Sequence, residues 1–218
     1  MIELVKIIDT MAERKCSDVL NKDSLRSGHN GPYHDDETPV RVSAHWFIIF
    51  SYEYGKTGNA IYLKAIRRLA DYLCGMKRNN GTFPCRKKAG KDQVNGTIGS
   101  AWAIEGLIEA AKVLEEDKYY SAAVDAFFAH PFDETLGLWN RRDVTGDTIG
   151  FDATYNHQLW FAAAGAQICA YKRNERIETC VLQFLERSKK TFRTFSSGLV
   201  FHFVYFDKPI IRKAKSIK

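Results

Sequence analysis

The stretch Ile98-Gly99-Ser100-Ala101-Trp102-Ala103-Ile104-Glu105-Gly106-Leu107 decides the fold class of this chain of 218 residues. Most of its positions carry small or apolar side chains, and only Glu105 is charged. Small residues let neighbouring helix backbones approach closely, and a helix with little polar surface is buried on several sides. The stretch therefore predicts an inner helix, over about 98–115, that is covered by other helices.

A unit of the same kind recurs along the sequence. Hydrophobic spacing and Gly or Pro breakers predict helices at about 2–21, 40–54, 60–76, 98–115, 119–128, 159–172 and 175–190. A long polar loop, an apolar inner helix, a tight turn and a charged outer helix follow one another three times, with a period of roughly 55 residues. This pattern predicts an all-α fold, an incomplete α/α toroid of about three to three and a half hairpins. A plain helical solenoid is the structural alternative.

Smaller features complete the predicted fold. Gly55 is expected to close the helix that begins at residue 40, and 137–140 with 144–147 is expected to form a β-hairpin. Residues 198–206 read as a strand. We expect a single domain over 1–206, followed by a basic tail over 207–218.

Composition and charge exclude several classes of protein. The net charge of +6 is concentrated in the tail and in a basic cluster at 86–91, and neither resembles a nucleic-acid-binding module. No apolar run is long enough for a signal peptide or a membrane span. The five cysteines are widely spaced, which argues against a zinc site or a disulfide framework and favours the cytoplasm. We expect no metal, no cofactor, no nucleic acid and no membrane contact.

Three polar loops carry the candidate functional residues. The loops at 27–39, 86–97 and 150–158 each precede an inner helix, so parallel inner helices would bring them to one end of the molecule. Carboxylates perform acid/base chemistry, and Trp, Asn and Gln bind sugars by stacking and hydrogen bonding. The candidate catalytic residues are Asp152, Asp92, Asp36 and His157. The candidate substrate-binding residues are His45, Trp46, Asn95, Trp102, Tyr155, Gln158 and Trp160.

Structural interpretations compete with each of these assignments. Asp152 could cap the following helix, and the three Trp residues at equivalent positions could space the two layers of the core. The His residues lack a second His or Cys at ligand spacing, so a metal site is not expected.

The quoted stretch resembles the inner helix of unsaturated glucuronyl hydrolases, in the six-hairpin glycosidase-like superfamily. Asn156-His157-Gln158-Leu159-Trp160, with the small residues 162–165, is similar to the same α/α toroids, which include N-acylglucosamine 2-epimerase-like proteins. The resemblance covers about 31–171. Where the hydrolases carry an Arg before the Gly, this chain has Ile98, so the resemblance does not extend to uronate specificity.

The resemblance implies a carbohydrate-active enzyme of the glycosidase or sugar-epimerase type with a saccharide ligand. A full toroid has about six hairpins, so the resemblance also implies a homodimer, a missing C-terminal half or a reduced, inactive homologue. A non-catalytic glycan- or protein-binding module is the alternative from another class. A terpene-cyclase-like toroid would depend on Asp35-Asp36-Glu37, in a loop that is too polar for it.

Overall fold

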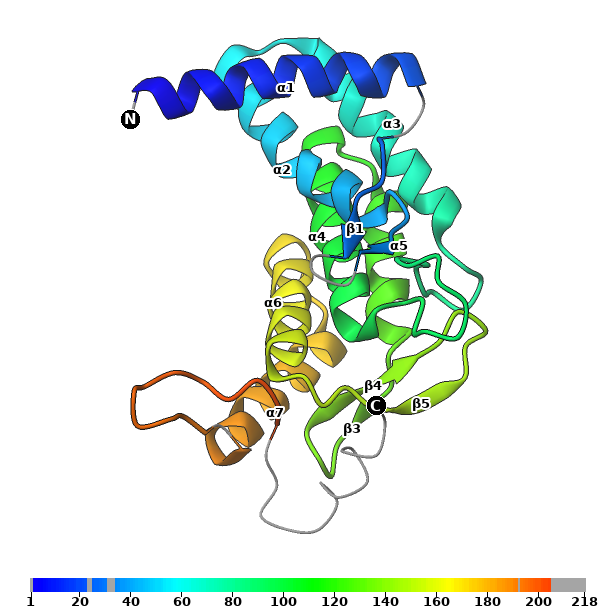
Figure 1. The fold of residues 1–218 in the computed structure, drawn as a ribbon, viewed down its shortest axis with the longest axis vertical. Coiled ribbons are helices and arrows are strands. Elements are labelled where there is room, and N and C mark those ends of the chain that lie inside the picture. The colour runs from blue at the N-terminus through cyan, green and yellow to red at the C-terminus, as the bar shows by residue number, and fades with distance from the viewer. Residues whose placement is uncertain (1, 23–24, 31–33, 192, 205–218) are drawn as a thin grey trace.

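The computed structural model describes residues 2–22, 25–30, 34–191 and 193–204, and it confirms the predicted all-α class. The helices are α1 (Ile2–Lys22), α2 (Val40–Thr57), α3 (Ala60–Met76), α4 (Gly96–Leu114), α5 (Asp117–Phe128), α6 (Tyr155–Tyr171) and α7 (Glu175–Thr191) (Figure 1). The strands are β1 (His29–Asn30), β2 (Asp35–Asp36), β3 (Phe132–Asp133), β4 (Leu138–Arg142) and β5 (Thr148–Phe151).

The helices form two layers. The inner helices α2, α4 and α6 lie side by side with α4 in the middle, and each packs against the outer helix that follows it, α3, α5 or α7. Helix α1 lies across one end of this array, against α2 and α3, and its first turns extend beyond the body (Figure 1). The predicted arrangement of inner and outer helices is therefore confirmed.

Glycines allow the close packing of α4. A Cβ atom on Gly99 would lie 1.9 Å from the carbonyl oxygen of Val94, and one on Gly106 would lie 2.8 Å from the ring of Phe47. Between the layers, Phe127 stacks on Phe161 with ring centroids 4.9 Å apart, and both side chains are buried. The small residues of the quoted stretch thus let large aromatic side chains fill the space around α4.

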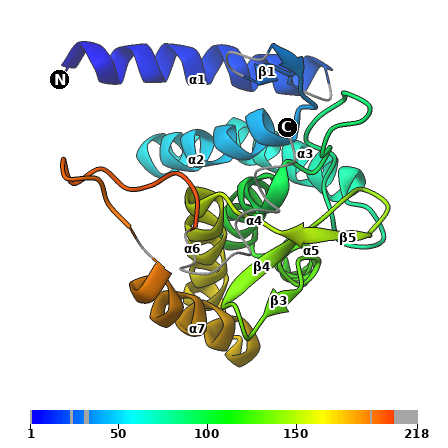
Figure 2. The same ribbon diagram turned by 60° about the horizontal axis from the view of Figure 1, so that its bottom comes forward.

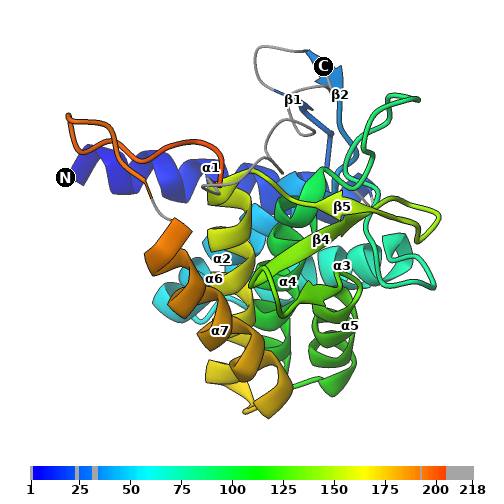
Figure 3. The same cartoon turned by 90° about the horizontal axis from the view of Figure 1, so that it is seen from below.

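A small antiparallel sheet, in the order β3-β4-β5, crosses the end of the helical body (Figures 2 and 3). The buried His130 links it to α4, because its Nε2 bonds to Ser100 Oγ at 2.9 Å and its Nδ1 to the carbonyl oxygen of Asn140 at 3.1 Å. Burial lowers the pKa of His130 to about 4, so the ring is neutral and can both donate and accept.

Two helix boundaries differ from those predicted by three residues or more. Helix α2 continues through Gly55 to Thr57 and ends where Gly58 adopts a left-handed φ of 65°. Gly55 is tolerated because it is exposed and no atom crowds it. Helix α6 begins at Tyr155, four residues before the predicted start. The residues just before it are fixed by hydrogen bonds from Thr97 N–H to the Asp152 carboxylate and from Val204 N–H to the Ala153 carbonyl.

The strand predictions need correction as well. Residues 144–147 form the turn and not the second strand, because Asp143 Oδ1 accepts hydrogen bonds from the backbone N–H groups of Thr145, Gly146 and Asp147. Within 193–204, only isolated bridges form, including one between Thr154 and Phe203. The rest of the predicted strand and the basic tail lie outside the described residues. Among the helices described, none is both long and apolar enough to cross a bilayer.

Two glycine substitutions test the packing of the inner layer. Gly106→Ala should lower the free energy of unfolding by about 1–3 kcal/mol, because the new Cβ would press on Phe47 and on the backbone of Ala44. Gly55→Ala should raise it by up to about 1 kcal/mol, since a helical position with open space gains from the better helix former. Urea denaturation measures both, and equal effects at the two positions would contradict the close packing of α4.

Candidate active site at the inner-helix N-termini

The three polar loops meet at one end of the molecule, as predicted. The first loop bonds to the second through Thr38 N–H to the Cys85 carbonyl, at 2.9 Å, and through Lys87 N–H to the Asp36 carbonyl, at 3.0 Å. The third loop reaches the second through Asp152, whose carboxylate accepts a hydrogen bond from Thr97 N–H at 2.9 Å. The N-termini of the inner helices therefore share one polar region.

Asp92 caps helix α4. Its Oδ1 accepts hydrogen bonds from the N–H groups of Val94 and Asn95, both at 3.1 Å, and its Oδ2 accepts one from Gly96 N–H at 2.8 Å. Asn95 is buried with a left-handed φ of 66°, which turns the chain into the helix. Arg141 Nη1 lies 3.9 Å from the same carboxylate.

Asp152 joins the third loop to α4 and to α6. This residue is only 3% exposed. Its Oδ2 accepts hydrogen bonds from Thr97 N–H and from His157 Nδ1, the latter at 3.0 Å. Its Oδ1 accepts a hydrogen bond from Thr154 N–H. Gly96 makes room for it, because a Cβ there would lie 2.3 Å from Asp152 Oδ2.

The protonation of this pair follows from its partners. Burial by itself would raise the pKa of Asp152, but the hydrogen bond and charge of His157 and the donated N–H groups hold that pKa below its ordinary value. An ionised Asp152 accepts a proton-bearing Nδ1, which fixes the tautomer of His157 and leaves Nε2 as the ring's basic nitrogen.

A band of side chains continues from His157 across the inner face. The Arg41 guanidinium lies 5.2 Å from the centre of the Trp102 ring, and the His45 ring meets Trp102 edge-on with centroids 6.1 Å apart. One turn along α4, Glu105 lies near the side chain of Trp160, which is one turn beyond His157 on α6 and lowers the pKa of the Glu105 carboxyl group. We call these six residues the inner band: Arg41, His45, Trp102, Glu105, His157 and Trp160.

The inner band is partly accessible. Trp160 is 39% exposed and His45 is exposed, whereas Trp102 is buried beneath Arg41 and His45. The surrounding protein, and then the charge of Arg41, lower the pKa of His45. His45 is thus exposed, although the protein around it disfavours its charged form.

The structure gives three of the predicted substrate-binding residues contacts within the fold. The Gln158 side chain is fully buried and bonds to both backbone groups of Trp139 and to the carbonyl of Asp152. Asn95 is enclosed in the turn before α4, and Tyr155 is buried near Phe184. Because these three side chains are occupied by contacts within the fold, the proposed site does not include them.

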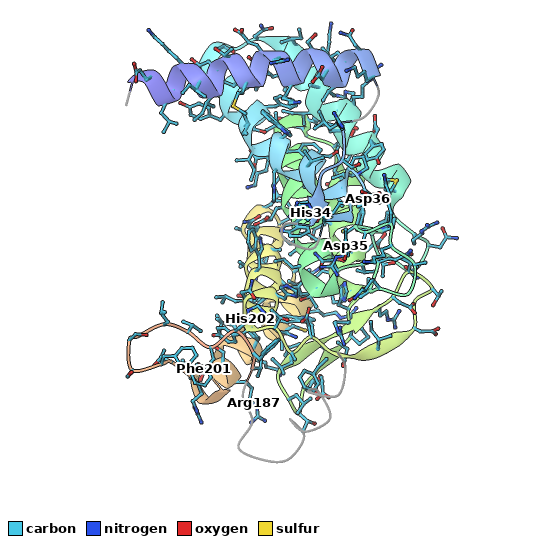
Figure 4. The ribbon with its side chains drawn as sticks, viewed as in Figure 1. His34, Asp35, Asp36, Arg187, Phe201 and His202 are labelled. Carbon is cyan, nitrogen blue, oxygen red and sulfur yellow. The ribbon has the colours of Figure 1, made fainter. Side chains whose placement is uncertain are left out.

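Two further predicted residues lie away from the inner band. Trp46 packs against Phe50, with centroids 5.6 Å apart. Asp36 is exposed in β2, beside His34 and Asp35 on the loop before α2 (Figure 4). Across the described parts of the chain, no hydrogen bond links the Asp36 carboxylate to Asp92 or Asp152. Of the three predicted carboxylates, only Asp92 and Asp152 come together.

Arg41 and Glu105 were not among the predicted site residues, although a signal for Glu105 was present. It is the one charged residue in the quoted stretch, three positions after Trp102, and so shares a helix face with it.

Cysteine and metal chemistry find little support in the site. The five cysteines are free thiols, and burial raises the pKa of the Cys85 thiol far above its usual range. Within the described ranges, no group of three or more His, Cys, Asp or Glu side chains is placed to hold a metal ion.

Sequence comparison identifies a curated relative of this chain. No family model matches the chain. A curated relative, "Archaeal glycosylation protein Q" of Haloferax volcanii, is 38% identical over 204 residues, which is 93% of this chain and 55% of the relative. The chain thus spans about half the length of that protein.

Solved structures place the fold. A D-mannose isomerase superposes with a TM-score of 0.58 at 16% identity, over 73% of this chain and 47% of that protein. Cellobiose 2-epimerase from Spirochaeta thermophila superposes with a TM-score of 0.56 at 13% identity, over 70% and 42%. The chain therefore has the α/α-toroid fold of these two proteins, which confirms the predicted fold, and it covers less than half of each of them.

The Asp152 interactions predict how stability depends on pH. Because the Asp152 pKa is lowered in the folded state, the unfolded chain takes up that proton more readily, and the carboxylate's stabilisation is lost as pH falls through the lowered pKa. Asp152→Asn should reduce this loss. At neutral pH the substitution should lower the free energy of unfolding by about 1–3 kcal/mol, because the amide N–H₂ would face N–H groups whose hydrogen bonds the carboxylate now accepts.

Urea denaturation between about pH 6 and about pH 3 measures this dependence. Asp36→Asn, at an exposed carboxylate, serves as the control and should keep the parental profile. An Asp152→Asn variant as stable as the parent at every pH would show that the buried hydrogen bonds contribute nothing.

Proposed function

We propose that this chain is part of a carbohydrate-active enzyme that moves a proton at a sugar carbon, as isomerases and epimerases do, with His157 as the acid/base. The single observation that carries the proposal is the hydrogen bond between His157 Nδ1 and the buried Asp152, at 3.0 Å. The activities named for the two solved structures support the reaction type, and the relative's name supports a saccharide ligand.

The pair suits proton transfer for a physical reason. Histidine is the side chain whose ordinary pKa lies closest to neutral pH, so it can take up and release a proton within a catalytic cycle. Asp152 is buried and accepts hydrogen bonds from four donor groups: the N–H and hydroxyl of Thr97, Thr154 N–H and His157 Nδ1. Its role in the proposal is therefore to hold the ring of His157 and stabilise the imidazolium, and the acid/base role passes to His157 Nε2.

The proposed step balances without a cofactor. In the open-chain sugar, Nε2 takes the proton from the carbon beside the carbonyl, and the C–H electrons form an enediolate whose former carbonyl oxygen takes up the proton of the neighbouring hydroxyl. Return of the proton to the neighbouring carbon gives the isomeric sugar, which one base can achieve. Return to the first carbon from the opposite face gives the epimer and needs a second base. His45 is the candidate because it is the other histidine of the inner band; it would enter the step protonated and leave it neutral, the form that its lowered pKa favours.

Hydrolysis of a glycosidic bond finds less support in the same residues. A glycosidase pairs a protonated carboxylic acid with a second carboxylate. The pKa of Asp152 is lowered, which disfavours the protonated form, and the Asp92 oxygens are occupied by three backbone N–H groups. We therefore favour isomerisation or epimerisation over glycoside cleavage.

A non-catalytic saccharide-binding module is the second candidate. It is favoured by the exposed ring of Trp160, which could stack on a sugar without any proton transfer. An inner face formed by three inner helices could hold a sugar against the inner band without enclosing it from water.

Proton exchange tests the enzymatic function directly. In deuterated water the parent should replace the hydrogen at C2 of D-mannose, D-glucose or cellobiose with deuterium, as followed by NMR. His157→Gln should slow this exchange by about 10²–10⁴-fold, because Gln cannot shuttle the proton. His202→Gln, a change of the same type at an exposed histidine beside the start of α6, should leave the rate unchanged (Figure 4).

The outcomes separate the two functions. Exchange retained in His157→Gln would remove His157 from the chemistry. A parent that binds one of these sugars without exchanging its C2 hydrogen would favour the binding module.

We further propose that a second copy of the chain completes the ring. Three hairpins are half of the six in a toroid, and both ends of the half-ring leave apolar side chains exposed. These are Leu4 and Ile7 on α1, at 61% and 54%, and Leu182 and Leu185 on α7, at 56% and 41%. A two-fold axis along the ring would bring each α7 end against the partner's α1 end, closing the site.

Light scattering after gel filtration gives the mass in solution. We expect twice the mass of the chain for the parent and a monomer for Leu182→Glu/Leu185→Glu, because two buried charges would oppose the interface. Ile149→Glu, at an exposed position on β5, should remain dimeric. A monomeric parent would show that a second copy does not complete the ring.

A further inference from the structure

Glu105 occupies an unusual position on the inner face. It is half-buried on the central helix α4, between Trp102 one turn before it and Trp160 on the neighbouring α6. The side chain of Trp160 lies near its carboxyl group, and Gln167 Nε2 donates to Oε1 at 3.5 Å. Burial raises the pKa of Glu105, and these two side chains oppose that rise only in part.

The carboxyl group has acceptor capacity to spare. An ionised carboxylate offers about four lone-pair positions, whereas within the described residues the hydrogen bond to the Glu105 carboxylate comes from the Gln167 amide, at the limit of hydrogen-bond distance. A half-buried carboxylate with so few donors gains when a ligand supplies more of them. Neighbouring sugar hydroxyls supply two, and the exposed ring of Trp160 suits the apolar face of the sugar.

The position of Glu105 relative to His157 sets the length of the ligand. Asp152 holds His157 beside Thr97, and Glu105 lies eight residues further along α4, or about 12 Å along the helix axis. Side chains on a helix tilt toward its N-terminus, so the carboxyl group is nearer to His157 than its Cα is. This span suits one sugar unit with its reacting carbons at His157 and its far hydroxyls at Glu105.

We propose that Glu105 determines specificity in this site: it holds a neutral sugar through hydroxyls remote from the reacting carbons and excludes sugars that carry a carboxylate there. The proposal rests on the proposed function only for the location of the sugar. A sugar acid would bring a second negative charge against a half-buried one, and would offer the carboxylate no hydroxyl at that position. Glu109, one turn further along the same helix, adds to the negative charge, although Lys112 lies 3.7 Å from it.

Ligand-detected NMR titration tests the specificity without requiring turnover. The probes are D-glucose and D-glucuronate, which differ only in the group at C6. The parent should bind glucose at least tenfold more tightly than glucuronate. Glu105→Gln keeps an acceptor for Gln167 but removes the charge, so it should weaken glucose binding about tenfold and erase most of the discrimination against glucuronate.

Two further variants make the result specific to the charge at position 105. Glu105→Asp keeps the charge but withdraws it from the ligand, so it should weaken glucose binding without admitting glucuronate. Glu109→Gln, the matched control on the same face, should change neither affinity by more than about twofold. Thermal melts of each variant establish that it is folded.

The outcomes distinguish this inference from the proposed reaction. Glu105→Gln with the parent's preference for glucose would overturn the role of Glu105, whatever the result of the exchange experiment. A parent that prefers glucuronate, or that binds neither sugar, would also overturn it. A parent that binds glucose as expected but exchanges no C2 hydrogen would uphold Glu105 while the proposed catalysis fails.

Discussion

The burial of α4 is the constraint on which the rest of the structure depends. A helix can be covered by α2, α5 and α6 together only if its side chains are small where those helices approach, and a Cβ atom at Gly106 would press on Phe47 and Ala44 of α2. Because the flanking helices approach so closely, the inner layer forms a continuous face, and the large aromatic side chains are placed between the layers. The few functional groups that α4 does present, Trp102 and Glu105, then have fixed neighbours on α2 and α6.

The start of α4 couples this packing to the chemistry. Backbone N–H groups at a helix N-terminus need acceptors, and here two carboxylates from different loops supply them, Asp92 locally and Asp152 from across the chain. The same oxygen of Asp152 also receives His157. A single carboxylate therefore contributes to the cap of the central helix, joins the third hairpin to the second and orients the histidine proposed to act on substrate. We therefore expect substitutions of Asp152 to affect both the proposed site and the core.

Much of the fold could be predicted from the sequence because hydrophobic spacing and glycine breakers are local signals. The bounds of α3 match the prediction residue for residue, whereas α6 begins early because its start is held by contacts that no local pattern records. The site was harder to predict for the same reason. The partner of Asp152 is Thr97, 55 positions away, and Gln158 bonds to Trp139 inside the fold, so neither role is visible in a short window. Trp46 and His45 are adjacent in sequence, but about 100° of helical rotation separates them, and only His45 meets Trp102.

We infer that the inner band on helices α2, α4 and α6 forms one sugar-binding face. The four tryptophans make it directly measurable, because each indole N–H gives its own signal in a nitrogen-15 correlation spectrum. Titration with D-mannose or D-glucose should shift the Trp160 and Trp102 signals, while Trp46, which packs against Phe50, and Trp139, which is buried beside the sheet, stay in place. Shifts confined to Trp46 or Trp139, or no shift with either sugar, would contradict the account.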